Sequence, residues 1–170
     1  TTDKVYENRE WPWPYRESDA LGGKDPYSAS KAAAELAVLA WRRSFFAQAD
    51  IPVVTARGGN VIGGGDWATD RLIPDVFRSL ADGIPLIIRS PKSVRPWQHV
   101  LTLCHGYLDL AEAAMAGSIS GEGAWNFGPE PTDCVSVSDL LALFASAGMG
   151  PEIRYSASEG KPESRMLTLD

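Results

Sequence analysis

The chain has 170 residues, of which 44% are hydrophobic and 22% are charged, and its formal net charge is -6. This is the composition of a globular protein, so it excludes a disordered one, and the length suffices for one core or most of two small lobes. Lysine and arginine are few and scattered, which excludes a nucleic-acid binder, because that class relies on a clustered basic surface.

The sequence also predicts the compartment. No apolar run approaches the ~18 residues that a membrane-spanning helix needs, and the residues after Thr1 lack the apolar segment of a signal peptide. Cys104 and Cys134 show neither metal-ligand spacing nor a disulfide framework. We therefore expect a soluble, cytoplasmic protein with reduced cysteines, no bound metal and no membrane partner.

The first predicted elements are the end of a strand over residues 1–6 and a long loop over residues 8–24, rich in Trp, Pro, Tyr and Gly. Loops of this length in compact domains are usually binding loops. Trp11, Trp13 and Tyr15 therefore either cover a ligand or pack the loop itself.

A helix is predicted next. Asp25 suits the cap position and Pro26 the first helical position, and the alanine-rich stretch that follows predicts a helix from Pro26 to about residue 47. The residues at core-facing spacing on this helix are Ala33, Leu36, Ala37, Ala40 and Trp41.

The remaining elements alternate between strands and helices. Further strands are predicted over residues 51–57, 85–89, 94–100, 123–127 and 152–155, and further helices over 72–81, 101–116 and 137–147. This order predicts an α/β architecture with parallel strands, in which catalytic groups gather at the carboxyl ends of the strands.

Tyr27 and Lys31 form the first candidate for chemistry. Four residues apart on a helix, they share one face with their side chains a turn apart. An ammonium at that distance stabilises a phenolate, which can then act as a general base. The same spacing arises by chance on ordinary helices, so the pair alone leaves both interpretations open.

Several further segments carry a family resemblance. They are residues 1–6 (TTDKVY), 7–11 (ENREW), 57–67 (RGGNVIGGGDW), 70–75 (DRLIPD) and 95–100 (RPWQHV). Together with Tyr27 and Lys31 they resemble the extended branch of the short-chain dehydrogenase/reductase superfamily, and within it the nucleotide-sugar 4,6-dehydratases. Lys4 stands where most of these enzymes carry Glu, and an Asp-Lys pair at this place is typical of members that act on CDP-glucose.

The resemblance implies the second half of a Rossmann-like doubly wound parallel sheet plus a smaller α/β substrate-binding lobe. Residues 1–62, to which about 99–128 return, would be the C-terminal part of an NAD-binding domain, and residues 63–98 and 129–170 the nucleotide-sugar-binding lobe. The glycines at 63–65 do not form the G-x-G-x-x-G turn that holds the NAD pyrophosphate. We therefore expect the Gly-rich N-terminal half to lie outside this chain.

The resemblance also assigns the catalytic roles. Tyr27 would accept the proton of the C4 hydroxyl while hydride passes to NAD, and Lys31 would assist Tyr27 and hold the nicotinamide ribose. Thr2 would hydrogen-bond the C4 oxygen, Asp3 would protonate the departing C6 hydroxyl, and Lys4 would remove the C5 proton.

Other residues are assigned to binding. Arg57 would contact the cofactor, and Arg95 would hold the nucleotide diphosphate, because guanidinium grips phosphate oxygens in a bidentate manner. The substrate-binding residues would be Asn60, Arg71, Leu72, Arg89, Arg95 and His99. A structural or solvated arginine remains the alternative for Arg57 and Arg89. For His99 and His105 a structural role is favoured over a metal site.

The implied activity is NAD-dependent conversion of CDP-glucose to CDP-4-keto-6-deoxyglucose, for deoxysugar and lipopolysaccharide O-antigen synthesis, in a homo-oligomer that associates through the Tyr27 helix region. Alternatives within the superfamily are a dehydratase acting on a dTDP- or GDP-sugar and a UDP-sugar 4-epimerase. A non-catalytic nucleotide-sugar-binding module is the alternative from another class.

Overall fold

The computed structural model describes residues 1–46, 49, 51–119, 123–156 and 166–170. Within these ranges the helical segments are η1 (Asp3–Val5), α1 (Pro26–Trp41), η2 (Arg42–Phe46), α2 (Leu72–Asp82), α3 (Val100–Met115), η3 (Pro131–Asp133) and α4 (Val137–Ser146). The strands are β1 (Thr55–Gly58), β2 (Asn60–Ile62), β3 (Leu86–Ile88), β4 (Val94–Arg95), β5 (Trp97–His99), β6 (Ala124–Phe127), β7 (Val135–Ser136) and β8 (Ile153–Tyr155).

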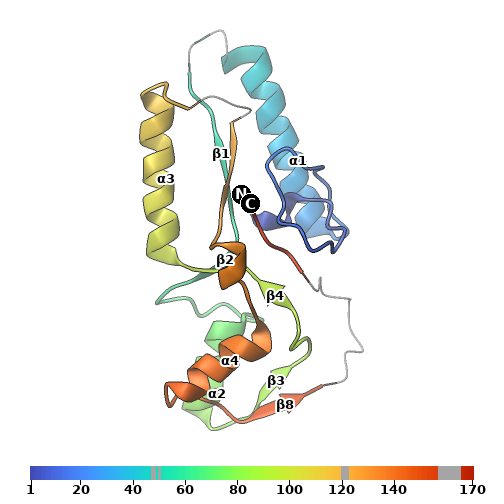
Figure 1. The fold of residues 1–170 in the computed structure, drawn as a ribbon, viewed down its shortest axis with the longest axis vertical. Helices are drawn as coiled ribbons and strands as arrows, with labels where there is room; N and C mark the ends of the chain where they lie inside the picture. Colours follow the sequence, from blue (N-terminus) through green and yellow to red (C-terminus); the bar gives the residue numbers. More distant parts are fainter. Residues whose placement is uncertain (47–48, 50, 120–122, 157–165) are drawn as a thin grey trace.

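The upper lobe is a parallel α/β unit (Figure 1). β1 and β6 pair in parallel, with Thr55 opposite Ala124, and a parallel bridge from Thr2 to Gly58 adds the N-terminal segment beside β1. In Figure 1, α1 and α3 stand on opposite sides of these strands. The predicted α/β class with parallel strands is confirmed, and the helix–strand order that predicted it is present.

The lower lobe contains α2, α4, β3 and β8 (Figure 1). β3 and β8 pair in parallel, and the core between them and the two helices is formed by Val76, Leu86, Ile88 and Leu141. Two short pairs lie between the lobes: β2 with β5 is parallel, whereas β4 with β7 is antiparallel.

α1 begins as the sequence predicts. The Asp25 carboxylate accepts hydrogen bonds from the backbone N–H groups of Tyr27 and Ser28. The Ser28 hydroxyl oxygen accepts a hydrogen bond from the backbone N–H of Asp25, which completes a capping box. The helix continues into the π-helical segment η2 and is described as far as Phe46, so the predicted end at residue 47 lies outside the described residues.

The predicted core face of α1 is wrong. Leu36 and Trp41, both assigned to it, are 55% and 57% exposed, whereas the buried residues of the helix are Ser28, Ala32 and Glu35. The alanine-rich composition hides the true face, because small apolar residues occur on every side of the helix. Contact with η1, and a buried ion pair to β1 described below, fix the orientation instead.

The last described residues pack onto the upper lobe. Leu167 and Leu169 are 4% and 3% exposed and pack with Val5, Tyr6 and Tyr15 in one hydrophobic cluster. We call residues 166–170 the C-terminal tail.

Backbone hydrogen bonds join this tail to the long loop of residues 8–24. The N–H of Tyr15 donates to the carbonyl of Thr168, and the N–H of Asp170 donates to the carbonyl of Tyr15, both at 2.9 Å. Tyr15 therefore packs the loop rather than covering a ligand, whereas Trp13 is 68% exposed. In the part of the chain that the structure describes, no helix is both long enough and apolar enough to cross a membrane.

Candidate active site

The turn that follows the N-terminal segment buries a carboxylate beside an exposed amine. Asp3 is fully buried, and its Oδ1 accepts a hydrogen bond from the Thr2 hydroxyl at 2.9 Å and from Lys4 Nζ at 3.1 Å. Asp3 Oδ2 is buried with no hydrogen-bond partner among the described residues. The Lys4 side chain is 43% exposed. The predicted residues Thr2, Asp3 and Lys4 thus form one cluster in which an acid and a base are in direct contact.

Tyr27 and Lys31 lie together on the first turns of α1. Lys31 Nζ is 5.8 Å from the centroid of the Tyr27 ring, and the Tyr27 side chain is 53% exposed. The structure therefore brings the predicted pair together on one face, open to a ligand. α1 packs against η1, so the Tyr-Lys pair and the turn of Asp3 and Lys4 belong to adjacent elements.

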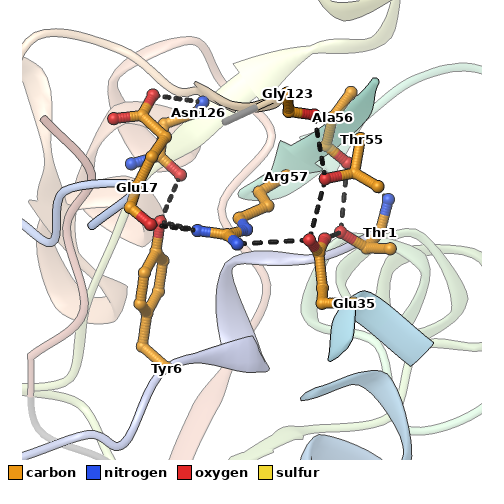
Figure 2. A network of polar contacts seen from close by, with 9 residues as sticks. All are labelled: Thr1, Tyr6, Glu17, Glu35, Thr55, Ala56, Arg57, Gly123 and Asn126. Carbon is orange, nitrogen blue, oxygen red and sulfur yellow. Dashed lines mark hydrogen bonds and ion pairs between the residues drawn. The ribbon is translucent and has the colours of Figure 1, made fainter. Parts of the chain in front are cut away.

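A buried ion pair joins α1 to β1 next to this site (Figure 2). Arg57 Nη2 donates to Glu35 Oε2 at 3.1 Å, and the two side chains are only 4% and 3% exposed. Glu35 also accepts hydrogen bonds from the hydroxyls of Thr55, at 2.8 Å, and Thr1. The carboxylate on the helix is therefore bonded to two separate segments of the sheet.

The other half of the Arg57 guanidinium reaches the far side of the turn (Figure 2). Arg57 Nη1 donates to the Tyr6 hydroxyl at 2.9 Å and to the carbonyl of Glu17 at 3.1 Å. The Tyr6 hydroxyl in turn donates to Asn126 Oδ1 on β6 at 2.7 Å. We call the side chains of Glu35, Arg57 and Tyr6, with the groups that they bond, the Glu35–Arg57 network.

The charges in this network are matched to one another. Burial raises the pKa of Glu35, but hydrogen bonds from Arg57, Thr1 and Thr55 outweigh it, so the pKa lies below its usual value. Burial raises the pKa of Tyr6, which Arg57 only partly offsets, so Tyr6 stays a neutral hydrogen-bonding phenol. Breaking a buried ion pair by removing one partner typically destabilises a protein by about 3–5 kcal/mol.

The structure joins some of the residues predicted to bind substrate. Asn60 on β2 lies opposite Trp97 of β5, and its N–H donates to the carbonyl of Pro96 at 3.1 Å. Asn60 therefore adjoins the segment that contains Arg95 and His99. Asn60 Oδ1 is buried and has no hydrogen-bond partner in the described chain, so the side chain has an acceptor available.

The other predicted binding residues are more dispersed. Arg95 Nη1 donates to the carbonyl of Val94 at 2.8 Å, and His99 Nδ1 accepts a hydrogen bond from the N–H of Leu101 as the cap of α3. Arg71 precedes α2 and Arg89 follows β3 in the lower lobe, where both are exposed. Leu72 packs against the core of that lobe.

Two predicted residues have structural partners. Arg57, assigned to the cofactor from the resemblance, is engaged in the buried network, which is the structural alternative, and its cofactor role stays a prediction. His105 forms an exposed pair with Asp109 at 2.9 Å. Across the described residues, no cluster of three or more His, Cys, Asp or Glu side chains could hold a metal ion.

Glu35 is the site-adjacent residue that the sequence analysis missed. The available signal was its position four residues after Lys31 and eight after Tyr27, which places a carboxylate next to their face of the helix.

The parallel strands, the Tyr-Lys helix and the turn at the adjacent strand end define a Rossmann-like α/β protein with a polar site between helix and sheet. Residues 1–128 match the model of the NAD dependent epimerase/dehydratase family, and the chain belongs to this family. The predicted family is thereby confirmed.

Known proteins refine this assignment. The chain is 49% identical over 146 residues to the CDP-glucose 4,6-dehydratase of Salmonella typhimurium, a match that covers 83% of this chain and 41% of the relative. The solved dTDP-glucose 4,6-dehydratase of Bacillus anthracis in complex with NAD superposes with a TM-score of 0.80 at 21% identity. The match covers 100% of this chain and 51% of the solved chain.

A double mutant of the dTDP-glucose 4,6-dehydratase DesIV from Streptomyces venezuelae, solved with NAD and DAU bound, has a TM-score of 0.74 at 26% identity, with coverage of 100% of this chain and 49% of its own. The chain thus spans about half or less of the length of these relatives. The Rossmann-like fold prediction is confirmed by the two solved structures.

Proposed function

We propose that this chain is part of an NAD-dependent nucleotide-sugar 4,6-dehydratase that converts CDP-glucose to CDP-4-keto-6-deoxyglucose. The observation that carries the proposal is the contact between buried Asp3 and Lys4 in a turn packed on the Tyr27 helix. The 49% identity to a relative named for this activity supports the choice of CDP-glucose.

The exposed side chains of α1 suit the cofactor. Lys31 and Tyr27 present an ammonium and a phenol side by side, and these groups can hydrogen-bond the hydroxyls of the nicotinamide ribose. NAD, when bound, supplies the acceptor for a hydride from C4 and the donor of that hydride to C6. Tyr27 takes the proton of the C4 hydroxyl, with Lys31 stabilising the phenolate and Thr2 hydrogen-bonding the C4 oxygen.

The elimination then uses the Asp3–Lys4 pair. Passage of a proton from Lys4 Nζ to Asp3 Oδ1 along their 3.1 Å hydrogen bond gives a neutral amine and a carboxylic acid. Lys4 removes the C5 proton, which the 4-keto group acidifies, while Asp3 gives its proton to the departing C6 hydroxyl, so one water leaves. The pair ends with the proton on Lys4 and a carboxylate on Asp3, as it began.

The binding lobe follows the same proposal. Residues 63–98 and 129–170 would hold the nucleotide sugar, with Arg95 on the diphosphate. Asn60, just before the first of these ranges, would offer the sugar its Oδ1, which has no partner among the described residues. Arg71, Leu72, Arg89 and His99 would line the nucleotide side. Residues 1–62 and about 99–128 would complete the NAD-binding domain, together with a Gly-rich N-terminal half.

The proposal also covers the compartment, the pathway and the oligomeric state. A cytoplasmic homo-oligomer that supplies deoxysugars for O-antigen would associate through the α1 region. Trp41 and Phe45, which are 57% and 58% exposed with ring centroids 5.0 Å apart, form an apolar patch at the end of α1 that supports this association.

The test is a substrate panel with the full-length enzyme. CDP-glucose, dTDP-glucose, UDP-glucose and a GDP-hexose are each incubated with NAD and enzyme, and products are identified by mass spectrometry and NMR. We expect CDP-glucose to lose one water and to give a 4-keto-6-deoxy sugar with the highest kcat/KM.

Other outcomes identify the alternatives. Preference for another nucleotide would reassign the substrate, and a product of unchanged mass inverted at C4 would indicate an epimerase. Binding of CDP-glucose without conversion would indicate a non-catalytic module.

A further inference from the structure

The Glu35–Arg57 network bonds the residues on both sides of the turn that contains Thr2, Asp3 and Lys4. On the near side, the Thr1 hydroxyl donates to Glu35. On the far side, the Tyr6 hydroxyl accepts from Arg57 at 2.9 Å. The two ends of the turn are therefore attached to one ion pair (Figure 2).

Glu35 of this ion pair lies on α1, the helix that also contains Tyr27 and Lys31. Glu35 follows Lys31 by four residues and Tyr27 by eight on α1, and a helix behaves as a rigid rod over two turns. A change in the position of the Glu35 carboxylate therefore changes the distance between the Asp3–Lys4 turn and the Tyr27–Lys31 pair.

Burial makes this connection stiff. Glu35 and Arg57 are only 3% and 4% exposed in their side chains, and the described partners of Glu35 hold both of its carboxylate oxygens. Few side-chain rotamers satisfy at once the five bonds that Glu35 and Arg57 make between them. Simple packing between α1 and the turn would not require buried charges at all.

We propose that Glu35 and Arg57 are positioning residues that hold the elimination turn in register with the oxidation pair, so that both half-reactions act on one bound sugar. The inference rests on the function proposed above and deepens it. Both side chains are buried. Their effect passes through Thr1 and Tyr6 to the residues between them.

The two half-reactions should respond unequally. Tyr27 lies in the first turn of α1, which the Asp25 capping box fixes independently of the network. The turn of Asp3 and Lys4 has network bonds at both of its ends. Loss of the network should therefore slow the elimination more than the oxidation.

The principal variant is Glu35→Leu with Arg57→Met in the full-length enzyme. It removes both charges together, because apolar replacements of a buried pair are often tolerated, whereas a single change leaves an unpaired charge. Stopped-flow absorbance of NADH gives the rate of oxidation, and the product of a single turnover gives the rate of elimination.

We expect substrate affinity within about threefold of wild type and a kcat lowered about 10- to 100-fold, the effect of an ångström-scale misplacement. NADH should accumulate in the single turnover. The matched control is Leu110→Ala, a buried change on α3 away from the network, which should leave the ratio of elimination to oxidation at the wild-type value.

A second variant keeps the test decisive if the double variant does not fold. Tyr6→Phe retains the ring in its cluster and the ion pair, and removes only the hydroxyl that joins Arg57 to Asn126. It should lower the ratio of elimination to oxidation about threefold to tenfold.

The outcomes separate the two proposals. A wild-type ratio in Tyr6→Phe, or in a folded double variant, overturns the positioning role while the dehydratase function stands. If wild-type enzyme does not convert CDP-glucose, the proposed function fails and this inference falls with it.

Discussion

Truncation of the Leu169 side chain tests whether the C-terminal tail stabilises the upper lobe. Leu169 is 3% exposed, so Leu169→Ala removes three buried carbons, which at about 0.8 kcal/mol each amounts to about 2.4 kcal/mol. The cavity left against Tyr6 and Tyr15 adds to this, because a backbone-bonded tail collapses only partly. We expect a total of about 3 kcal/mol, a large share of the 5–15 kcal/mol that typically stabilises a domain.

The assay compares urea unfolding and amide hydrogen exchange of the full-length protein. The unfolding midpoint should fall, and the N–H of Tyr15, which donates to the carbonyl of Thr168, should exchange faster than in wild type. Leu108→Ala is the control, since Leu108 on α3 is 65% exposed and its truncation should change stability by no more than about 0.5 kcal/mol. A loss of less than about 1 kcal/mol in the free energy of unfolding of Leu169→Ala, with unchanged amide exchange at Tyr15, would refute the stabilising role of the tail.

Two further predictions concern catalysis and acid stability. Tyr27→Phe should abolish the first hydride transfer, whereas Lys4→Ala should allow NADH to form but lower elimination and deuterium exchange at C5 about 100- to 10,000-fold, so wild-type exchange in Lys4→Ala would exclude Lys4 as the base. Because the folded pKa of Glu35 is lowered, its stabilising effect is present above its unfolded value of about 4.5 and is lost as the pH falls below that. On acidification from about pH 6 to below about pH 4, the urea midpoint of wild type should therefore fall relative to that of the Glu35→Leu/Arg57→Met variant. A difference between the two midpoints that is independent of pH would contradict the charged state assigned to Glu35.

Local signals in the sequence predicted what local chemistry determines. The Asp25 cap and the start of α1 at Pro26 follow from hydrogen bonds within three residues. The adjacency of Tyr27 and Lys31 follows from the helical repeat. These features need no knowledge of the rest of the fold.

Features that depend on distant partners were not predictable in this way. The burial of Asp3 and the Arg57 ion pair require the strand order, and the hydrogen bond from Tyr6 joins residues separated by 120 positions. The orientation of α1 was mistaken for the same reason, since a glutamate is seldom buried unless it is paired, and the partner Arg57 lies on a distant strand.

The strand pairings of this chain are interleaved, and that limits how it can be recombined. β1 pairs with β6, and β3, which lies between them in the sequence, pairs with β8, which lies after β6. A bridge from Tyr15 to Leu169 spans all of these strands. A crossover placed anywhere between Tyr15 and Leu169 separates at least one pair of hydrogen-bonded partners. Exchange of a contiguous cassette with a homologue would therefore place strands from two different proteins side by side.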